Sequence, residues 1–289
     1  MAVKQQVRQF YDQVGWQEGD DGNYQNAQYE DLRPVSQEYI HRCHLRVLRH
    51  LKPGGRFLLD AGSGPIQYPE YLEYSRSYQR RVCVDISFVA LLEARKKIGD
   101  HGLFVVADVA NLPFISDGFD GIVSLHTIHH LPIEEQALAY VGFHRVLAQK
   151  SSAVVVNGWK HPPLAGLMDR LTHIALRLKG SQQTEAAVSG AQVEQTSPLA
   201  SSQPESRNPQ GTFVQKTDAA WLRKEAGSRL PSGSLEIWVW RSASVRFLRA
   251  VVQPEWGGRW LLRLLFWLEE RFPHYFGENG QYPLVVIKK

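Results

Sequence analysis

The sequence contains only two cysteines, Cys43 and Cys83, and neither belongs to a CxxC motif or to a cluster of cysteine and histidine. Both lie in apolar segments, which indicates buried thiols in a reducing compartment, and no metal site is predicted. No stretch approaches the roughly 18 apolar residues of a membrane span. The N-terminus, MAVKQQVRQFYDQVGW, also lacks the apolar core of a signal peptide. These absences predict a cytoplasmic protein.

An excess of charge of one sign is also missing. The 33 Lys and Arg residues oppose 29 Asp and Glu residues, and the basic residues form no stripe with interleaved aromatics. A nucleic-acid partner is therefore not predicted. With 43% hydrophobic and 21% charged residues, the 289-residue chain has the composition of a globular protein with one large domain and an elaboration.

Apolar runs that alternate with helical patterns define the predicted fold. The runs occupy residues 56–61, 82–86, 103–108, 120–126 and 153–157, followed later by 235–240 and 282–288. The helical patterns occupy 36–51, 67–78, 133–147, 164–179, 217–228 and 257–272, and Ser87 is expected to cap another helix. Strands separated by helices pair in parallel through right-handed crossovers. The sequence therefore predicts an α/β protein with a doubly wound, Rossmann-like sheet of seven strands.

Four parts are predicted along the chain. Residues 1–55 form an N-terminal helical and aromatic cap segment, and residues 56–160 form the core of the sheet. A helical insertion follows over 161–232, in which a stretch at about 181–210 is rich in Ser, Gln, Glu and Pro, lacks aromatics, and is expected to be a mobile linker. Residues 233–289 supply the C-terminal strands and an apolar helix that complete the sheet and an acceptor pocket.

The first strand ends in the turn Asp60-Ala61-Gly62-Ser63-Gly64. Glycines at alternate positions let a backbone turn tightly and approach a ligand closely. In a doubly wound sheet, ligands bind beyond the carboxyl ends of the strands. This turn is therefore a candidate ligand site, although one Gly-x-Gly is weak support by itself.

The next two strands also end in aspartates. Asp85 is suited to accept the hydroxyl hydrogens of a ribose. Asp108, with the backbone N–H of Val109, is suited to recognise an adenine edge. Any single aspartate at a strand end is often only a capping residue, but three successive strands with acidic ends, at Asp60, Asp85 and Asp108, form a much stronger pattern.

The motifs of residues 57–126 resemble those of class I S-adenosylmethionine-dependent methyltransferases, in particular the small-molecule group that includes quinone-biosynthesis enzymes (methyltransferase type 11). The matching segments are FLLDAGSGP, VCVDIS, ADVANLPF, FDGIVSLHTIHHLP and HRVLAQKSSAVVV. The resemblance implies S-adenosyl-L-methionine as cofactor and an antiparallel last strand. It implies that the backbone at Gly62 and Gly64 lies close to the methionine part of the cofactor. It also implies that Asp85 holds the ribose and that Asp108 with Val109 holds the adenine. The predicted cofactor-binding residues are Asp60, Ala61, Gly62, Ser63, Gly64, Asp85, Ile86, Asp108, Val109 and Tyr11.

Two positions depart from related patterns. Gln67 stands where a dinucleotide-binding turn has its third glycine, which argues against a pyrophosphate site. The Lys-Pro-Gly-Gly turn that usually precedes the fifth strand reads Gln149-Lys150-Ser151-Ser152.

Three histidines, His126, His129 and His130, follow the fourth strand. One of them is the predicted general base if the acceptor is a phenol or enol, with His126 and His129 favoured. Alternatively, His130 packs under the turn and His126 only lines the cofactor cleft. Tyr11 and Trp16 are expected to fold over the cofactor, although simple packing on the sheet is a second interpretation.

The helices at 164–179 and 257–272 are strongly apolar. We expect them to roof a pocket for a hydrophobic acceptor. Contact with a membrane surface, as apolar faces flanked by arginine can make, is a second interpretation, and ordinary core packing is a third.

The predicted function is transfer of a methyl group from S-adenosyl-L-methionine to a small hydrophobic or aromatic acceptor, by O- or C-methylation. A nicotinamide-dependent oxidoreductase and a cofactor-binding module without catalysis remain as alternatives. A nucleic-acid or protein methyltransferase is disfavoured because no Asn-Pro-Pro-Tyr-like tetrapeptide follows the fourth strand. The sequence indicates neither the acceptor nor the oligomeric state.

Overall fold

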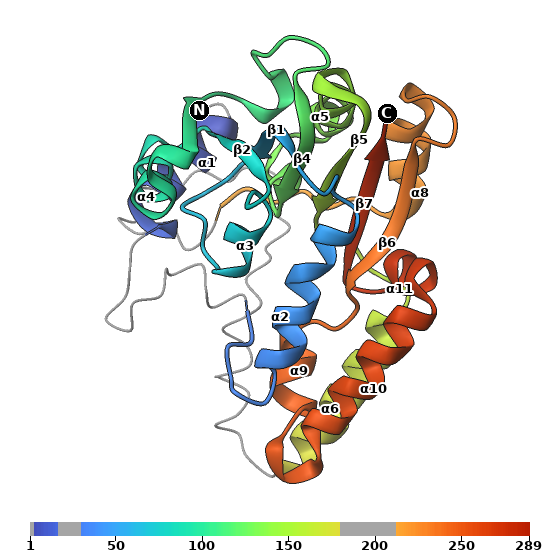
Figure 1. The fold of residues 1–289 in the computed structure, drawn as a ribbon. Coiled ribbons are helices and arrows are strands. Elements are labelled where there is room, and N and C mark those ends of the chain that lie inside the picture. The colour runs from blue at the N-terminus through green and yellow to red at the C-terminus, as the bar shows by residue number, and fades with distance from the viewer. Residues whose placement is uncertain (1–2, 17–29, 180–211) are drawn as a thin grey trace, which may run out of the picture.

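A seven-stranded mixed sheet forms the centre of the protein (Figure 1). The computed structural model describes residues 3–16, 30–179 and 212–289. The predicted linker at 181–210 lies outside these residues. The strand order is β3-β2-β1-β4-β5-β7-β6. The strands are β1 Gly55–Ala61, β2 Tyr78–Asp85, β3 Gly102–Val106, β4 Phe119–Leu125, β5 Leu147–Val156, β6 Leu235–Arg241 and β7 Tyr282–Lys288.

The strand directions confirm the predicted fold class. Strands β1 to β5 are mutually parallel, and β7 runs antiparallel to both β5 and β6. All seven predicted strands are present. Strand β5 begins at Leu147, earlier than the expected residue 153, because residues 149–152 belong to the strand instead of forming a separate turn. The strand is irregular there, since Lys150 lies in the left-handed region at φ 58°.

Helices cover both faces of the sheet. On one face, α5 (Ile133–Val146) packs on the strands together with a helical segment that runs from α8 (Ala219–Trp221) into a π-helical turn. The other face carries α3 (Glu70–Glu73) and α4 (Phe88–Ile98). Ser87 caps α4, since its Oγ accepts from the backbone N of Ala90 at 3.1 Å.

Two predicted helices are shorter than the periodicity suggested. The helix expected at 36–51 is α2 (Gln37–Leu45) followed by a 3-10 turn. The helix expected at 67–78 is reduced to α3. Its apolar positions Tyr71, Tyr74 and Tyr78 are buried, but Tyr78 already belongs to β2 and pairs with Gly55.

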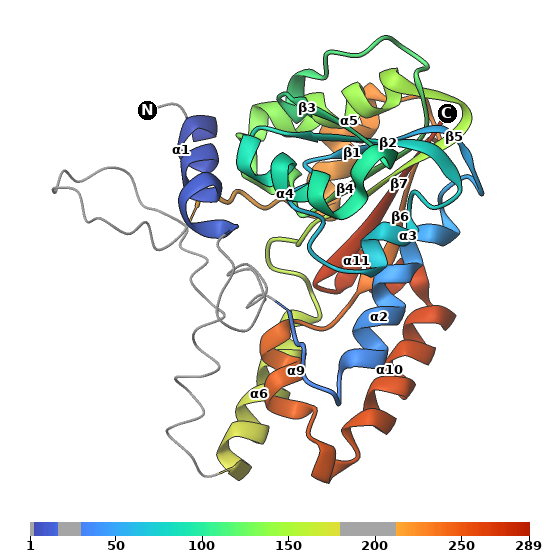
Figure 2. The same ribbon diagram turned by 60° about the vertical axis from the view of Figure 1, so that its left-hand side comes forward.

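A helical lobe projects beyond the sheet (Figure 2). It contains α2, α6 (Ala165–Lys179), α9 (Val245–Val251) and α10 (Gly258–Arg271), and α11 (Pro273–Asn279) connects α10 to β7. Its core includes Tyr39, Leu248 and Phe266. None of the helices in the described ranges is long and apolar enough to cross a membrane.

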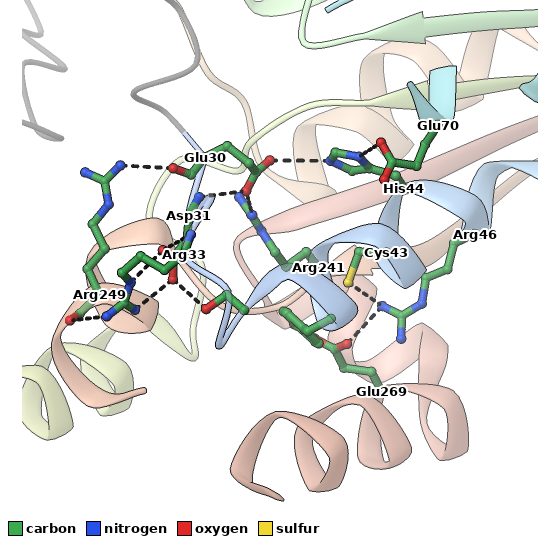
Figure 3. A network of polar contacts seen from close by, with 12 residues as sticks. Glu30, Asp31, Arg33, Cys43, His44, Arg46, Glu70, Arg241, Arg249 and Glu269 are labelled. Atoms are coloured by element: carbon green, nitrogen blue, oxygen red, sulfur yellow. Dashed lines mark hydrogen bonds and ion pairs between the residues drawn. The ribbon is translucent and has the colours of Figure 1, made fainter. Parts of the chain in front are cut away.

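Glu269 joins this lobe to the end of β6 (Figure 3). The side chain is fully buried and accepts hydrogen bonds from Tyr39 Oη at 2.8 Å, Ser242 N at 2.8 Å and Arg46 Nη1 at 2.9 Å. A buried carboxylate is tolerated when donors and a cation surround it. The residue before Ser242 is Arg241, whose side chain reaches the Glu30 carboxylate (Figure 3).

Candidate functional site

A cavity of about 260 Å³ lies at the carboxyl ends of the parallel strands. Nearly all of the predicted site residues line it: Tyr11, Asp60, Gly62, Ser63, Gly64, Asp85, Ile86, Asp108, Val109, His126, His129 and His130. Ala61 is the exception. It is buried beneath the turn, where its carbonyl accepts a hydrogen bond from Ser124 Oγ at 2.8 Å.

The glycine turn needs its glycines for two reasons. Gly62 and Gly64 adopt φ values of 76° and 53°, which L side chains rarely occupy. A Cβ on Gly62 would also lie 2.2 Å from Thr127 Oγ1, and one on Gly64 would lie 3.0 Å from Trp16 Cζ2. The bare backbone therefore forms a wall of the cavity beneath Thr127 and Trp16.

Asp85 organises the loops on either side of it. Its carboxylate accepts from the backbone N of Gly64 and of Ser87, each at 2.9 Å. Burial raises its pKa to about 6. Each carboxylate oxygen has two lone pairs, so these bonds leave capacity for further donors such as ribose hydroxyls.

Asp60 forms a buried ion pair that the sequence did not suggest. Its Oδ2 accepts from Arg81 Nε at 3.0 Å and from Nη2 at 2.5 Å, and Arg81 Nη1 donates to the Tyr71 carbonyl at 2.5 Å. Both charged side chains are almost inaccessible to solvent. A weak signal was available, since Arg81 directly precedes the apolar run VCVD.

The N-terminal helix α1 (Val3–Phe10) reaches the part of the cavity that Asp108 lines. The Lys4 ammonium forms ion pairs with Asp108 and with Glu135 on α5. The other oxygen of Asp108 accepts from Ala110 N at 2.9 Å. Lys4 thus occupies an acceptor oxygen on the carboxylate predicted to recognise adenine.

Lys4→Met is therefore expected to strengthen S-adenosylmethionine binding by about 2- to 5-fold, the worth of a partly exposed ion pair. Titration calorimetry on the variant and the wild type measures this change. Lys224→Met, at a solvent-exposed lysine remote from the cavity lining, is the matched control. Weaker binding by Lys4→Met would show that the lysine supports the cofactor instead of competing with it.

Tyr11 closes over the cavity and holds His130. Tyr11 Oη lies 2.8 Å from His130 Nε2, and His130 Nδ1 lies 2.7 Å from the Phe213 carbonyl. Because a carbonyl only accepts, the Nδ1 atom carries the proton and Nε2 accepts from the tyrosine. The Trp16 ring stacks on Tyr11 with centroids 5.0 Å apart.

His126 and His129 face the other part of the cavity. His126 adopts φ 56°, and its ring contacts those of Trp240 and Tyr282, with centroids 5.1 and 5.7 Å away. His129 Nδ1 lies 3.3 Å from Asn157 Oδ1. Burial lowers the pKa of His126 to about 3, that of His130 to about 4, and that of His129 well below its usual range. All three histidines are consequently neutral near pH 7.

Further lining residues come from outside the 56–160 core. Glu30 and Arg241 are buried and form an ion pair, and His44 Nε2 lies 3.5 Å from Glu30 Oε2 (Figure 3). Burial alone would raise the pKa of Glu30, but the Arg241 guanidinium and His44 together outweigh burial and lower the pKa to about 2. Lys216 and Tyr282 also line the cavity. No motif in the sequence marked these residues.

The two apolar helices do not contribute to this cavity. Neither α6 nor α10 supplies a lining residue within the described ranges. Their buried faces pack instead against α9 and α2 in the helical lobe. The prediction that they roof the cavity is therefore wrong for this cavity.

The family described as "Methyltransferase domain" matches residues 59–155. These residues are a methyltransferase domain. The match runs from within β1 to within β5 and includes the three histidines, and with the antiparallel β7 it confirms the class I assignment that the motifs predicted.

A curated relative of the methyltransferase domain is the malonyl-[acyl-carrier protein] O-methyltransferase of Legionella pneumophila. It is 34% identical over 103 residues, which cover 35% of this chain and 36% of that protein. The match therefore spans only about a third of that relative's length.

Two solved structures share the fold across nearly their whole length. The [4+2]-cyclase SpnF has a TM-score of 0.52 at 17% identity, covering 99% of this chain and 97% of its own. A geranyl diphosphate methyltransferase has a TM-score of 0.51 at 15% identity, covering 100% of this chain and 99% of its own. At these identities the likeness shows that the methyltransferase domain and the surrounding elements form one shared fold.

Proposed function

We propose that this protein transfers the methyl group of S-adenosyl-L-methionine to a small-molecule acceptor. The observation that carries this proposal is that Gly62, Gly64, Asp85 and Asp108 line one cavity of the methyltransferase domain. The bound cofactor supplies an electrophilic methyl group on a sulfonium. The protein has to hold it, exclude water and align the acceptor with it.

The residues present fit such a cofactor. The Gly62–Gly64 backbone forms a wall without Cβ atoms for the methionine part. The Asp85 carboxylate would accept from the ribose hydroxyls, and Asp108 with the Val109 N–H would hold the adenine. Tyr11 and Trp16 would cover the bound cofactor and exclude water.

Calorimetry with S-adenosylmethionine and S-adenosylhomocysteine tests the cofactor assignment, since an enzyme of this kind has to bind both donor and product. Binding of NADH with no binding of either compound would favour the oxidoreductase alternative. Binding of both without formation of S-adenosylhomocysteine from any acceptor tried would favour the non-catalytic module.

The acceptor side of the cavity supports a small hydrophobic or aromatic acceptor. Tyr68, Tyr71 and Tyr282 line it together with His126 and His129. The Legionella relative is named as an O-methyltransferase, and we propose O-methylation here as well.

We propose different roles for the three histidines. His126 and His129 contact the acceptor, while His130 positions Tyr11. A general-base role is energetically unfavourable for a phenol with a pKa of about 10, because each unit between the two pKa values costs about 1.4 kcal/mol. The pKa of His126 is only about 3.

The Tyr11–His130 hydrogen bond gives a direct test of the covering role. Tyr11→Phe and His130→Ala are each expected to weaken S-adenosylmethionine binding by about 2- to 10-fold, the worth of one net hydrogen bond. Because both variants remove the same bond, the double variant should bind hardly less tightly than either single variant. Additive losses in a calorimetric double-mutant cycle would contradict a shared role.

We also propose that the α10–α11 face contacts an anionic membrane surface. Trp260, Leu264 and Trp267 follow one another at helical spacing and are 74, 54 and 58% exposed. The exposed Phe272 and Tyr275 extend this face. Arg259, Arg263 and Arg271 are exposed on the same helix. Tryptophan beside arginine on an outer helix suits an anionic headgroup region.

Sedimentation with vesicles tests this contact. The wild type should pellet with mixed phosphatidylcholine and phosphatidylglycerol vesicles, and Trp260→Ser with Trp267→Ser should reduce binding about tenfold or more. Ile115→Ser is the control, because Ile115 is 80% exposed elsewhere on the molecule. A wild type that stays in the supernatant, or that binds neutral vesicles equally, would contradict the proposal.

A further inference from the structure

Gln67 lines the cavity directly after the glycine turn. A dinucleotide-binding turn has its third glycine at this position, and the N-terminus of a helix beside it holds the anionic group of the ligand. The present chain differs in both respects, because a side chain with a hydrogen-bond donor stands here and α3 is only 4 residues long. An anionic ligand group at this place would therefore depend on a side-chain donor.

The residue before Gln67 has a strained backbone. Ile66 adopts φ 55°, in the left-handed region that a β-branched residue rarely occupies. Its side chain is buried, its backbone N donates to the Ser63 carbonyl at 3.4 Å, and its own carbonyl accepts from Lys97 Nζ at 2.9 Å. Such strain persists only where the surroundings enforce it, and it is concentrated at ligand sites. The fold therefore imposes the position of Gln67 at the cavity.

The amide nitrogen of Gln67 has no hydrogen-bond partner in the part of the chain that the structure describes, although it is buried. A buried donor that makes no hydrogen bond costs free energy, so a donor of this kind in a cavity wall indicates a ligand group that accepts from it. An ammonium group only donates. The missing partner is therefore an oxygen or another acceptor atom of the ligand.

Two ion pairs in the cavity wall allow this acceptor to be anionic. Asp60 is paired with Arg81, and Glu30 is paired with Arg241. Because each of these carboxylates is neutralised by its arginine, neither of them excludes an anionic ligand group from the cavity. A hydrogen bond from a neutral amide to a carboxylate is charge-assisted, and it is stronger than a bond between two neutral groups.

We propose, on the basis of the proposed function, that Gln67 Nε2 donates a hydrogen bond to the carboxylate of the methionine part of the cofactor. This carboxylate is the one anionic group of S-adenosylmethionine. Gln67 stands three residues beyond Gly64, at the end of the wall proposed for the methionine part. Gln67 thereby selects a methyl donor with a complete amino acid, since adenosine thioethers that lack the carboxylate gain nothing from it.

Calorimetry with the full chain compares S-adenosylhomocysteine with S-adenosyl-3-thiopropylamine, an amine that differs from it only in lacking the carboxylate. Gln67→Leu removes the donor at similar size, and Gln67→Glu places a carboxylate against that of the ligand. Gln79→Leu makes the same substitution at an exposed glutamine outside the cavity lining, and it is the matched control. The melting temperatures of all four proteins monitor their folding.

The wild type and Gln79→Leu should bind S-adenosylhomocysteine more tightly than the amine. Gln67→Leu should weaken S-adenosylhomocysteine binding by about 10- to 100-fold, as for a hydrogen bond to a charged acceptor, and should change binding of the amine by less than about twofold. Gln67→Glu should weaken S-adenosylhomocysteine binding at least as much and should favour the amine.

Equal losses for the two ligands, or unchanged S-adenosylhomocysteine binding by either Gln67 variant, would overturn the inference while leaving the proposed function intact. Failure of the wild type to bind S-adenosylhomocysteine would instead overturn the proposed function.

Discussion

Replacement of Arg81 by Met is expected to lower the free energy of unfolding by about 3–5 kcal/mol, the usual cost of leaving one partner of a buried ion pair uncompensated. Arg81 donates twice to Asp60 and once to the Tyr71 carbonyl, and both charged side chains are almost inaccessible to solvent. The variant would strand the Asp60 carboxylate inside the protein and leave the carbonyl without this donor. Urea denaturation of both proteins measures the difference.

The neighbouring Arg80 offers a matched control, because it is exposed and its side chain donates to the Gln79 carbonyl in its own segment. Arg80→Met should change stability by less than about 0.5 kcal/mol, as for an ordinary surface substitution. The double variant Arg81→Met with Asp60→Asn should recover part of the loss, since no buried charge remains. Equal effects of Arg80→Met and Arg81→Met would refute the importance assigned to this ion pair.

Replacement of Asp85 by Asn is expected to weaken S-adenosylmethionine binding by about 10- to 100-fold, since a hydrogen bond to a charged acceptor contributes about 1.5–3 kcal/mol. The amide keeps the shape of the carboxylate but has a single acceptor oxygen. It therefore cannot accept from Gly64, Ser87 and a ribose as the carboxylate can. Calorimetry measures the change, and Asp100→Asn on the exposed surface is the control.

The same residue predicts a pH dependence. Burial raises the Asp85 pKa from 3.8 to about 6. At pH 5 only about a tenth of the cofactor-free protein would carry the ionised form, so the apparent dissociation constant should rise about tenfold between pH 8 and pH 5. The free energy of unfolding should depend on pH in the opposite direction from cofactor binding. The native state binds the Asp85 proton more tightly than the unfolded chain does. The contribution of Asp85 to stability is therefore largest at low pH and is lost as the pH rises through 6. Asp85→Asn should flatten the binding profile, and a wild-type profile that is already flat would contradict the assignment.

The sheet and the wall of the cavity formed by the 56–160 core could be predicted because both depend on local patterns. The run RFLLDA is followed directly by the glycine turn, and the runs that end at Asp85 and near Asp108 are apolar for their whole length. Parallel strands then bring their carboxyl ends to one edge as a matter of geometry. Periodicity was less reliable at 67–78, where three buried tyrosines produce a helical pattern although the last of them is already in a strand.

The remaining residues of the site could not be predicted, because each takes its role from a partner distant in the sequence. Lys4 meets Asp108, and Glu30 meets Arg241. Lys216 is positioned by hydrogen bonds that its two neighbours, Gln215 and Thr217, make to the far side of the β4 turn and to Lys160. Single charged residues carry no periodic signal, and only the folded chain brings them together.

The separate origins of the two cavity walls have a consequence for how such a protein can change. The wall proposed for S-adenosylmethionine, the methyl donor, comes from continuous segments at the ends of β1, β2 and β3. The opposite wall is formed by residues from four distant segments, namely Glu30, Lys216, Arg241 and Tyr282. Substitutions in those four segments can change which acceptor is methylated, while the recognition of S-adenosylmethionine stays the same. Exchange of residues 212–217 between homologues is thus a compact route to new selectivity.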